Sequence, residues 1–231
     1  MLTPMEKDQF WHMIDGLTPY DHAVEMMQSH HRRLVAGEAG EAVFLLSHPP
    51  VYTAGTSARE EDLLDAHLPE NIQIIADTGR GGQWTYHGPG QRIIWPVLDL
   101  NRRKRDIRAY IHTLEGWVMQ VLDRQFGITS QRREGLPGLW VSRGDIGRPE
   151  QMDKIAAIGV RISKWVTMHG IAVNIDPDLS HYRGIVACGV TDGGITSMAE
   201  LGHLVSEAEF DMALQAEFAN FFGKNSEMGR V

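Results

Sequence analysis

The stretch KIAAIGVRISKWVTMHGIAVNI, residues 154–175, decides the fold. It contains two apolar runs, 154–162 and 166–175, which are rich in the β-branched residues that favour strands. Only a short link with a Lys-Trp pair separates the runs, so the sequence predicts that they form a β-hairpin. This hairpin would place a sheet in the middle of the chain.

Shorter apolar runs on either side of this hairpin predict further strands. They are AVFLL (42–46), IQIIA (72–76), LWVS (139–142) and IVACGV (185–190). RIIWPVLDL (92–100) also resembles a strand, but a proline cannot donate to a neighbouring strand, so Pro96 restricts this one to a sheet edge or a bulge. The polar residues 143–153 are predicted as a loop.

Two long segments carry clear helix signals. Thr18 followed by Pro19 predicts an N-cap and a first turn, and apolar residues then recur at helical spacing as far as Leu34. Residues 106–126 have a continuous apolar face, which includes the isoleucines near its start, and Gly127 follows its end.

Ser197 and Ser206 each begin a capping box, with a glutamate three residues later, and each predicts the start of a helix. The sequence therefore predicts an α/β (α+β) fold with a mixed, largely antiparallel sheet flanked by helices. We expect one catalytic domain over residues 1–231, with a core of about 20–222, a short N-terminal extension and a frayed C-terminal tail.

The composition excludes several classes of protein. Of 231 residues, 42% are apolar and 23% are charged, as in ordinary globular domains, and the net charge of −8 makes a nucleic-acid partner a poor expectation. No apolar run approaches the roughly 18 residues of a membrane helix. A single cysteine favours a reducing compartment, so we expect a cytoplasmic protein that does not bind membranes. No metal is expected, because a lone cysteine cannot form a thiolate cluster and none of the 11 histidines lies in an H-E-x-x-H pattern.

Cys188 is the sharpest candidate for chemistry, because it ends a predicted strand beside a glycine-rich turn. The alternative is a small buried apolar residue, since free cysteines are commonly buried. A cysteine nucleophile needs a nearby cation to stabilise its thiolate. Lys154 begins an apolar strand, where desolvation would lower its pKa into the range that suits proton transfer. Lys154 could instead lie in solvent at the end of the polar loop, and His87 and His169 are rival bases.

The stretch RGGQWTYHGPGQ, residues 80–91, holds four glycines among large polar and aromatic side chains. Taken alone it could be a turn, or it could be a wall that lets a ligand approach the backbone. The basic run Arg102–Arg105, with Arg108 after it, departs from the acidic composition of the chain. It is either a solvated loop or a docking patch for an acidic partner.

Four motifs together resemble the lipoyl(octanoyl) transferases, and they occur in the order RGGQWTYHGPGQ (80–91), KIAAIG (154–159), WVTMHGIAVN (165–174) and ACGVTDGGITSM (187–198). The resemblance covers roughly residues 20–222 and implies a fold similar to the catalytic domains of biotin and lipoate-protein ligases. It implies transfer of an octanoyl group from acyl carrier protein, without a cofactor. The acceptor would be a lysine of the lipoyl domains of 2-oxoacid dehydrogenase complexes or of the glycine cleavage H protein.

The resemblance also implies a role for each matching residue. Cys188 matches the nucleophile that forms an acyl thioester, and Lys154 matches the lysine that lowers the pKa of this thiol. The implied substrate-binding residues are Arg80, Gly81, Gly82, Gln83, Trp84, Thr85, Tyr86, His87, Ala157, Ile158, Gly159, Gly170, Ile171 and Ala172. The glycines would leave room for an acyl chain, and Trp84 and Tyr86 would provide an apolar wall. Asp153 departs from the pattern, because a basic residue is expected before the lysine; it could tune Lys154 or cap the entrance.

Three other functions stay open at this point. The chain could be an ATP-dependent ligase that activates free lipoate on the same fold. It could be a thioesterase that uses the Cys–Lys pair with water as the acceptor. It could also be an inactive module that binds acyl carrier protein, in which case Cys188 would be inert.

Overall fold

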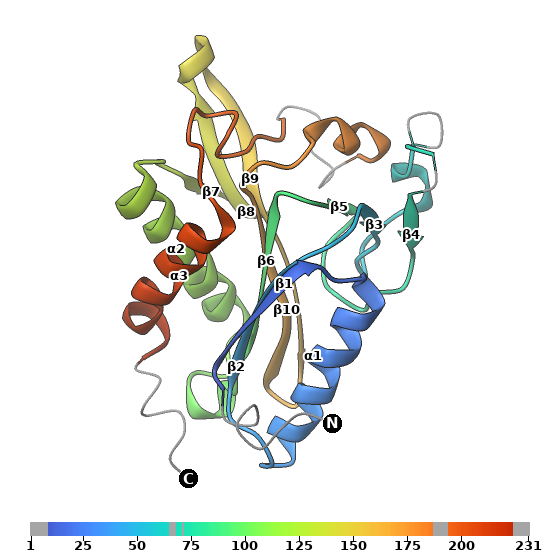
Figure 1. The fold of residues 1–231 in the computed structure, drawn as a ribbon, viewed down its shortest axis with the longest axis vertical. Coiled ribbons are helices and arrows are strands. Elements are labelled where there is room, and N and C mark those ends of the chain that lie inside the picture. Colours follow the sequence, from blue (N-terminus) through green and yellow to red (C-terminus); the bar gives the residue numbers. More distant parts are fainter. Residues whose placement is uncertain (1–8, 65–67, 71, 187–193, 224–231) are drawn as a thin grey trace.

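The main sheet of the computed structural model has seven strands and is largely antiparallel, as predicted (Figure 1). The structure describes residues 9–64, 68–70, 72–186 and 194–223. In spatial order the strands are β1 (Trp11–Leu17), β2 (Ala42–Ser47), β6 (Gln91–Val97), β10 (Val166–Asn174), β9 (Arg148–Ser163), β8 (Leu136–Arg143) and β7 (Gln131–Arg133). Only the β1–β2 pair of this sheet is parallel, and β1 precedes the predicted core of residues 20–222.

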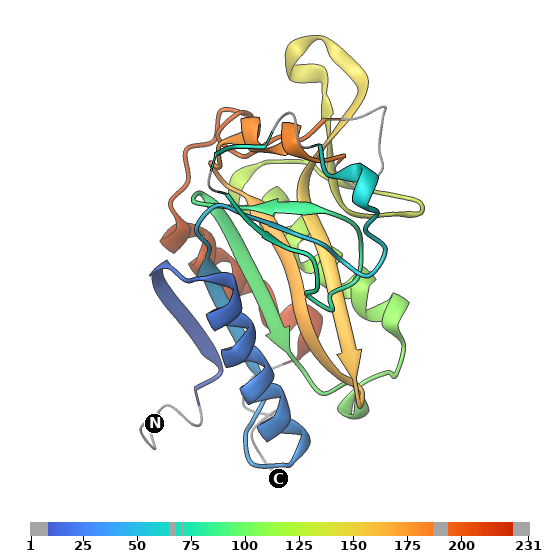
Figure 2. The same cartoon turned by 90° about the vertical axis from the view of Figure 1, so that its right-hand side faces the viewer.

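A second, three-stranded sheet and three helices surround the main sheet. The small sheet has the order β4 (Gln73–Ile75), β3 (Val51–Thr53) and β5 (Thr85–His87). The helices are α1 (Tyr20–Val35), α2 (Ile107–Phe126) and α3 (Glu207–Phe222), and the short 3₁₀ segments are η2 (Glu60–Asp62), η4 (Leu100–Arg102), η5 (Gly144–Ile146) and η6 (Leu179–Gly184). Helices α2 and α3 cover one face of the main sheet, and α1 lies on the other face, beside the small sheet (Figures 1 and 2).

The hairpin predicted over residues 154–175 is confirmed by the pairing of β9 with β10. The two strands pair from Ser163 opposite Val166 to Ala156 opposite Val173. Lys164 and Trp165 form the turn, with φ of 52° and 62°. Positive φ at both central residues is the geometry of the turn whose twist fits an antiparallel hairpin.

Strand β6 lies inside the sheet, so the predicted edge position of the proline-containing strand is wrong. Its pairing with β2 includes Pro96, but its pairing with β10 ends at Ile94 opposite Ile171. Beyond this point the β10 backbone takes a left-handed conformation at His169, with φ of 57°. The Thr167 hydroxyl then donates to the Pro96 carbonyl at 2.6 Å and accepts from the Leu98 N–H at 2.9 Å. This irregularity in β10 is what accommodates a proline in a central strand.

The long helices are confirmed, but two predicted helix starts are wrong. Asp106 caps α2 by accepting from the Ala109 N–H, and Ser206 and Glu209 form the predicted capping box of α3. Helix α1 begins after Pro19, and no side chain in the described ranges caps it; the Thr18 carbonyl instead accepts from His48. Ser197 accepts from the Glu200 N–H at 3.1 Å, yet it opens only a single turn.

The predicted polar loop over residues 143–153 is also wrong, because most of it belongs to strand. Strands β8 and β9 continue as a hairpin that turns at η5, and the tip of this hairpin projects from the molecule (Figures 1 and 2). Lys154 therefore lies well inside β9, not at its start. Of the strand predicted over residues 185–190, only Ile185 and Val186 are described; Ile185 makes an isolated bridge to Leu63.

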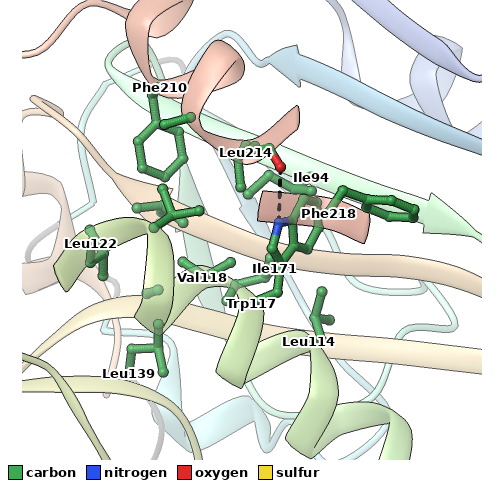
Figure 3. Packing of buried hydrophobic residues seen from close by; sticks show 14 of the residues in the cluster. Ile94, Leu114, Trp117, Val118, Leu122, Leu139, Ile171, Phe210, Leu214 and Phe218 are labelled. Atoms are coloured by element: carbon green, nitrogen blue, oxygen red, sulfur yellow. Dashed lines mark hydrogen bonds between the residues drawn. The ribbon is translucent and has the colours of Figure 1, made fainter. Parts of the chain in front are cut away.

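The largest hydrophobic core fills the space between the main sheet and helices α2 and α3. Trp117 of α2 lies at its centre, and its indole N–H donates to the Leu214 carbonyl of α3 at 3.0 Å (Figure 3). Phe218 packs edge-on against the Trp117 ring at 5.3 Å. This core fixes the sheet from one side, and α1 packs against the other side, beside the small sheet.

Candidate active site

A cavity of about 390 Å³ contains nearly all of the predicted substrate-binding residues. Thirteen of the fourteen residues named from the resemblance line it, the exception being Tyr86. Its other lining residues are Tyr20, Ser57, Ile93, Trp95, Ile107, Ile111, Gly135, Leu136, Pro137, Lys154, Val160 and His169. Most of this surface is apolar, as expected of a site for a small molecule with a long hydrocarbon part.

The cavity lies along the free edge of β9. Strand β8 pairs with β9 only as far as Gly138 opposite Ala157. Beyond it the glycine-rich stretch takes over this edge, because the Gly81 N–H donates to the Val160 carbonyl at 3.1 Å. A Cβ on Gly159 would lie 2.7 Å from the Gly81 carbonyl oxygen, so only a glycine allows this approach.

Arg80 holds the glycine-rich stretch in place. Its guanidinium group donates to the carbonyls of Gly81, at 2.9 Å, and Gln83, at 2.9 Å. It also donates to the carbonyl and the hydroxyl of Thr53 in β3. The planar fork of an arginine suits such a set of acceptors. The geometry therefore supports a role for Arg80 in holding this loop.

Two neutral histidines line the polar part of the cavity. Burial holds the pKa of His87 well below its ordinary value and lowers that of His169 to about 3. The Nδ1 atom of His87 lies 2.6 Å from the amide oxygen of Gln91, so Nδ1 carries the proton and Nε2 is left as an acceptor. Both rings are therefore uncharged at neutral pH.

Tyr86 lies outside the cavity, so the apolar wall expected from Trp84 and Tyr86 is formed by Trp84 without it. Successive side chains of a strand point to opposite faces, and in β5 it is Thr85 and His87 that face the cavity. The Tyr86 ring packs instead against Tyr52 at 5.7 Å and against Tyr182 at 5.5 Å.

Lys154 lies in the cavity wall and is only 3% exposed, which excludes the alternative of a lysine in solvent. Its Nζ donates to the Pro137 carbonyl at 3.1 Å and lies 4.6 Å from the centre of the Trp140 ring. A carbonyl oxygen and an aromatic face both favour a cation. The protein thus positions an ammonium group beside an apolar cavity.

Cys188 lies outside the described residues, so its distance from Lys154 is not defined. The chain is described again on both sides of it. The Val186 N–H donates to the Asp62 carbonyl at 2.8 Å, and the Gly194 carbonyl accepts from the Lys154 N–H at 2.9 Å. Within the described ranges, no three His, Cys, Asp or Glu side chains are arranged to hold a metal ion.

Comparison with known proteins identifies the family. The pattern that defines the lipoyl protein ligase A/B catalytic domain matches residues 19–219. The chain belongs to this family. It is 50% identical over 218 residues to an octanoyltransferase of Jannaschia sp. (strain CCS1), covering 92% of this chain and 98% of that protein. It is 49% identical over 214 residues to an octanoyltransferase of Parvibaculum lavamentivorans, covering 93% and 92%. The resemblance inferred from the four motifs is thereby confirmed.

Solved structures of the lipoyl protein ligase A/B family share the fold. A lipoate-protein ligase A bound with ATP superposes with a TM-score of 0.67 at 16% identity, over 92% of this chain and 85% of that chain. The ligase in an archaeal lipoylation system from Thermoplasma acidophilum gives a TM-score of 0.66 at 16% identity, over 92% and 83%. The predicted fold, a sheet flanked by helices as in lipoate-protein ligases, is confirmed.

The sequence did not predict the cavity-lining residues that α2 and β8 provide. Ile107 and Ile111 fit the apolar face of a helix, so periodicity assigns them to the core. In the structure both line the cavity, and Ile107 is 47% exposed. Leu136 and Pro137 precede a predicted strand and carry no signal of their own. Helical periodicity identifies the apolar face of a helix, but it does not show whether that face packs against a core or lines a cavity.

The basic residues before α2 differ in their environment: some form ion pairs within the protein and others are exposed. Arg103 turns inward to pair with the buried carboxylate of Glu41, and Arg102 lies 3.6 Å from Asp99. Lys104, Arg105 and Arg108 are exposed and flank Ile107 in the sequence. Arg103 is therefore not part of an exposed docking patch.

Proposed function

We propose that this chain is an octanoyltransferase that moves an octanoyl group from octanoyl-acyl carrier protein, through a thioester on Cys188, to a lysine of a lipoyl domain. The observation that carries the proposal is a buried lysine in the wall of an apolar cavity, in a chain about half identical to octanoyltransferases. An acyl thioester is already activated, so the reaction needs no cofactor. The acceptors are the lipoyl domains of 2-oxoacid dehydrogenase complexes and the glycine cleavage H protein.

The first half of the reaction loads the enzyme. The Cys188 thiolate, stabilised by the Lys154 ammonium, attacks the carbonyl carbon of the donor thioester. A new S–C bond forms at Cys188 and the bond to the pantetheine sulfur breaks. The pantetheine thiolate leaves with a proton from the Lys154 ammonium, so Lys154 enters the second half as a neutral amine. Lys154 is already held as a donor by the Pro137 carbonyl and the Trp140 ring.

The second half transfers the acyl group. The amine of the acceptor lysine attacks the Cys188 thioester, an amide bond forms, and the S–C bond breaks. Lys154 is the group we assign to accept the proton that the amine loses. His87 and His169 are less suited to this role, because burial keeps the pKa of each far below neutral pH and makes each ring a weak base.

The cavity suits a saturated acyl chain. Glycines 81, 82 and 159 bring backbone close to the space, while Ile93, Ile158 and Ile171 supply apolar contact. The uncharged state of His87 and His169 avoids placing a cation against hydrocarbon. These features support an octanoyl group as the cargo.

The same chemistry indicates the cellular compartment of the enzyme and the surface to which the donor protein docks. A thioester-forming cysteine must stay reduced, so we place the enzyme in the cytoplasm. No helix in the described part of the chain is long and apolar enough to cross a membrane. The exposed Lys104, Arg105 and Arg108 lie beside Ile107 at the rim of the cavity and are the docking residues that we propose for the acidic donor protein.

A ligase is the second candidate, because one protein with this fold is a lipoate-protein ligase bound with ATP. Intact-protein mass spectrometry separates the two functions. We mix the chain with octanoyl-acyl carrier protein, without ATP or acceptor, and expect an octanoyl adduct that Cys188→Ala lacks. Addition of a lipoyl domain should discharge this adduct, and the lipoyl domain should gain the same mass.

Three results would contradict the transferase. Modification of the lipoyl domain from free octanoate only when ATP is present would identify a ligase. Release of free octanoate at full rate without an acceptor would identify a thioesterase. An unloaded chain that binds acyl carrier protein would be an inactive binding module.

Lys154→Arg tests the proposed base, since arginine keeps the charge but does not give up its proton. We expect octanoyl transfer to slow about 100-fold or more.

A further inference from the structure

Asp153, the residue that departs from the expected basic residue before Lys154, has a buried and fully used carboxylate. It is 3% exposed. One oxygen, Oδ2, accepts from Arg143 Nη1 at 2.9 Å. The other, Oδ1, accepts from the Gly194 N–H at 2.8 Å and from the Gln151 side chain at 2.9 Å. A buried carboxylate with this many donors is an anchoring point for the groups that surround it.

The Gly194 backbone that Asp153 holds is also bonded to Lys154. The Lys154 N–H donates to the Gly194 carbonyl at 2.9 Å, and the Thr196 N–H donates to the Lys154 carbonyl at 3.0 Å. Residues 194–196 thus run parallel to β9 at the position of Lys154. Both polar groups of the Gly194 backbone are bonded to the pair Asp153–Lys154.

The contact between Asp153 and Gly194 is too close for any other residue at position 194. A Cβ on Gly194 would lie 2.7 Å from Asp153 Oδ1 and 3.0 Å from its Cγ. The carboxylate therefore lies against the Cα of Gly194. Since real Cβ atoms do not approach so closely, a side chain at 194 requires that this contact opens.

Arg143 extends the anchor to both sides. It pairs with Asp153 and also with Asp145 at 3.0 Å and Glu200 at 3.2 Å. Glu200 in turn accepts from the Thr196 hydroxyl at 2.7 Å. The network joins the β8–β9 hairpin to the turn that follows residue 196.

We propose that Asp153 is a positioning residue, which fixes the Gly194 backbone against Lys154 so that the chain following the proposed nucleophile is held at the strand position of the proposed base. This rests on the proposed function. Residue 188 lies six positions before residue 194, so an anchor at Gly194 limits its distance from the Gly194 backbone to about 20 Å at full extension. The described contacts of the Asp153 carboxylate tie down the chain at Gly194.

A double-mutant cycle tests this role. Asp153→Ala should lower kcat for octanoyl transfer about tenfold or more and change KM for the donor less than twofold, because the cavity itself is intact. Gly194→Ala should do the same, since its Cβ pushes the carboxylate away. The double variant should be no slower than Asp153→Ala alone, because the space left by the carboxylate accepts the new methyl group.

Two further variants separate positioning from general support. Asp153→Asn keeps an oxygen that accepts from Gly194 and should recover most of kcat. Asp145→Ala removes another carboxylate from Arg143 without touching Gly194, and should leave kcat within about twofold. Multiplicative losses in the double variant, or an equal loss in Asp145→Ala, would overturn the proposal.

Hydrogen exchange gives a readout that does not depend on the reaction. The amides of Gly194 and Thr196 should exchange at least tenfold faster in Asp153→Ala than in the wild type or in Asp145→Ala. If the wild type transfers no octanoyl group, the proposed function fails, and this exchange difference still decides whether Asp153 anchors the segment. Unchanged exchange at both amides would refute the anchor even in an active enzyme.

Discussion

The two faces of the main sheet differ in the side chains that they bury. The face under α2 and α3 is packed with aliphatic and aromatic side chains, centred on Trp117 and Phe218 (Figure 3). The face toward α1 and the small sheet buries an arginine and several histidines, among them Arg80, His48 and His169. The α2–α3 face is mainly an apolar core, with a buried Arg92–Asp211 ion pair at α3. The other face combines a smaller apolar cluster with buried polar groups around the cavity.

This difference indicates which face contributes most to folding stability and which to octanoyl transfer. The apolar core under α2 and α3 gains free energy from close packing. On the other face, hydrogen bonds from buried polar side chains hold backbone segments in place, as Arg80 does for the stretch that follows it. We therefore expect mutations on the first face to affect folding, and mutations on the second to affect transfer more than folding.

The largest expected effect is on the apolar face. Phe218→Ala removes a buried ring from the centre of the core and should lower the free energy of unfolding by about 3–5 kcal/mol. Octanoyl transfer by the fraction that remains folded should be unchanged. Urea denaturation and an activity assay at low temperature measure the two quantities. Met212→Ala, on the same helix but 63% exposed, should cost less than about 0.5 kcal/mol. Equal losses for the two variants would mean that this face is not the main source of stability.

A smaller loss of stability, with a larger loss of activity, is expected at Arg80. Arg80→Lys keeps the charge but cannot reach the carbonyls of Gly81 and Gln83 together with Thr53, so unfolding should become easier by about 2 kcal/mol. Octanoyl transfer should fall about tenfold beyond what the unfolded fraction explains, because the glycine-rich stretch loses its support. Kinetics on protein shown to be folded by circular dichroism measure this. If activity falls only in proportion to the folded fraction, the two faces do not differ in the way proposed.

The same contrast explains what the sequence alone could predict. Elements of the apolar face follow from periodicity and caps: α2 starts at the Asp106 cap and ends at Gly127, and α3 has its capping box. The central place of β6 could not be predicted, because the feature that tolerates Pro96 is the left-handed backbone at His169 on a different strand.

The candidate site was predictable for a different reason. Thirteen of the fourteen residues predicted to bind substrate line the cavity, and that prediction comes from matching motifs and not from physics. The exception, Tyr86, is the one that strand alternation turns away. The anchor between Asp153 and Gly194 joins residues 41 positions apart, and no local pattern indicates such a pair. The α2 residues of the cavity wall could not be predicted, because a helix face that lines a cavity has the same apolar sequence pattern as one that packs against a core.

The smallest expected effect is a pH dependence that comes from a buried histidine on the face toward α1. Burial lowers the pKa of His48 to about 4, whereas an unfolded histidine titrates near about 6.5. The unfolded state therefore binds more protons below pH 6.5, so stability is full above that pH and is lost as the pH falls toward the folded pKa. Between pH 7.5 and 5.5 one such histidine removes about 1.3 kcal/mol. His48→Gln should make the fall in unfolding free energy over this range smaller by that amount, while Phe218→Ala should leave the fall unchanged. Denaturation at the two pH values measures it, and an unaltered pH dependence in His48→Gln would show that this face is more open to water than its burial indicates.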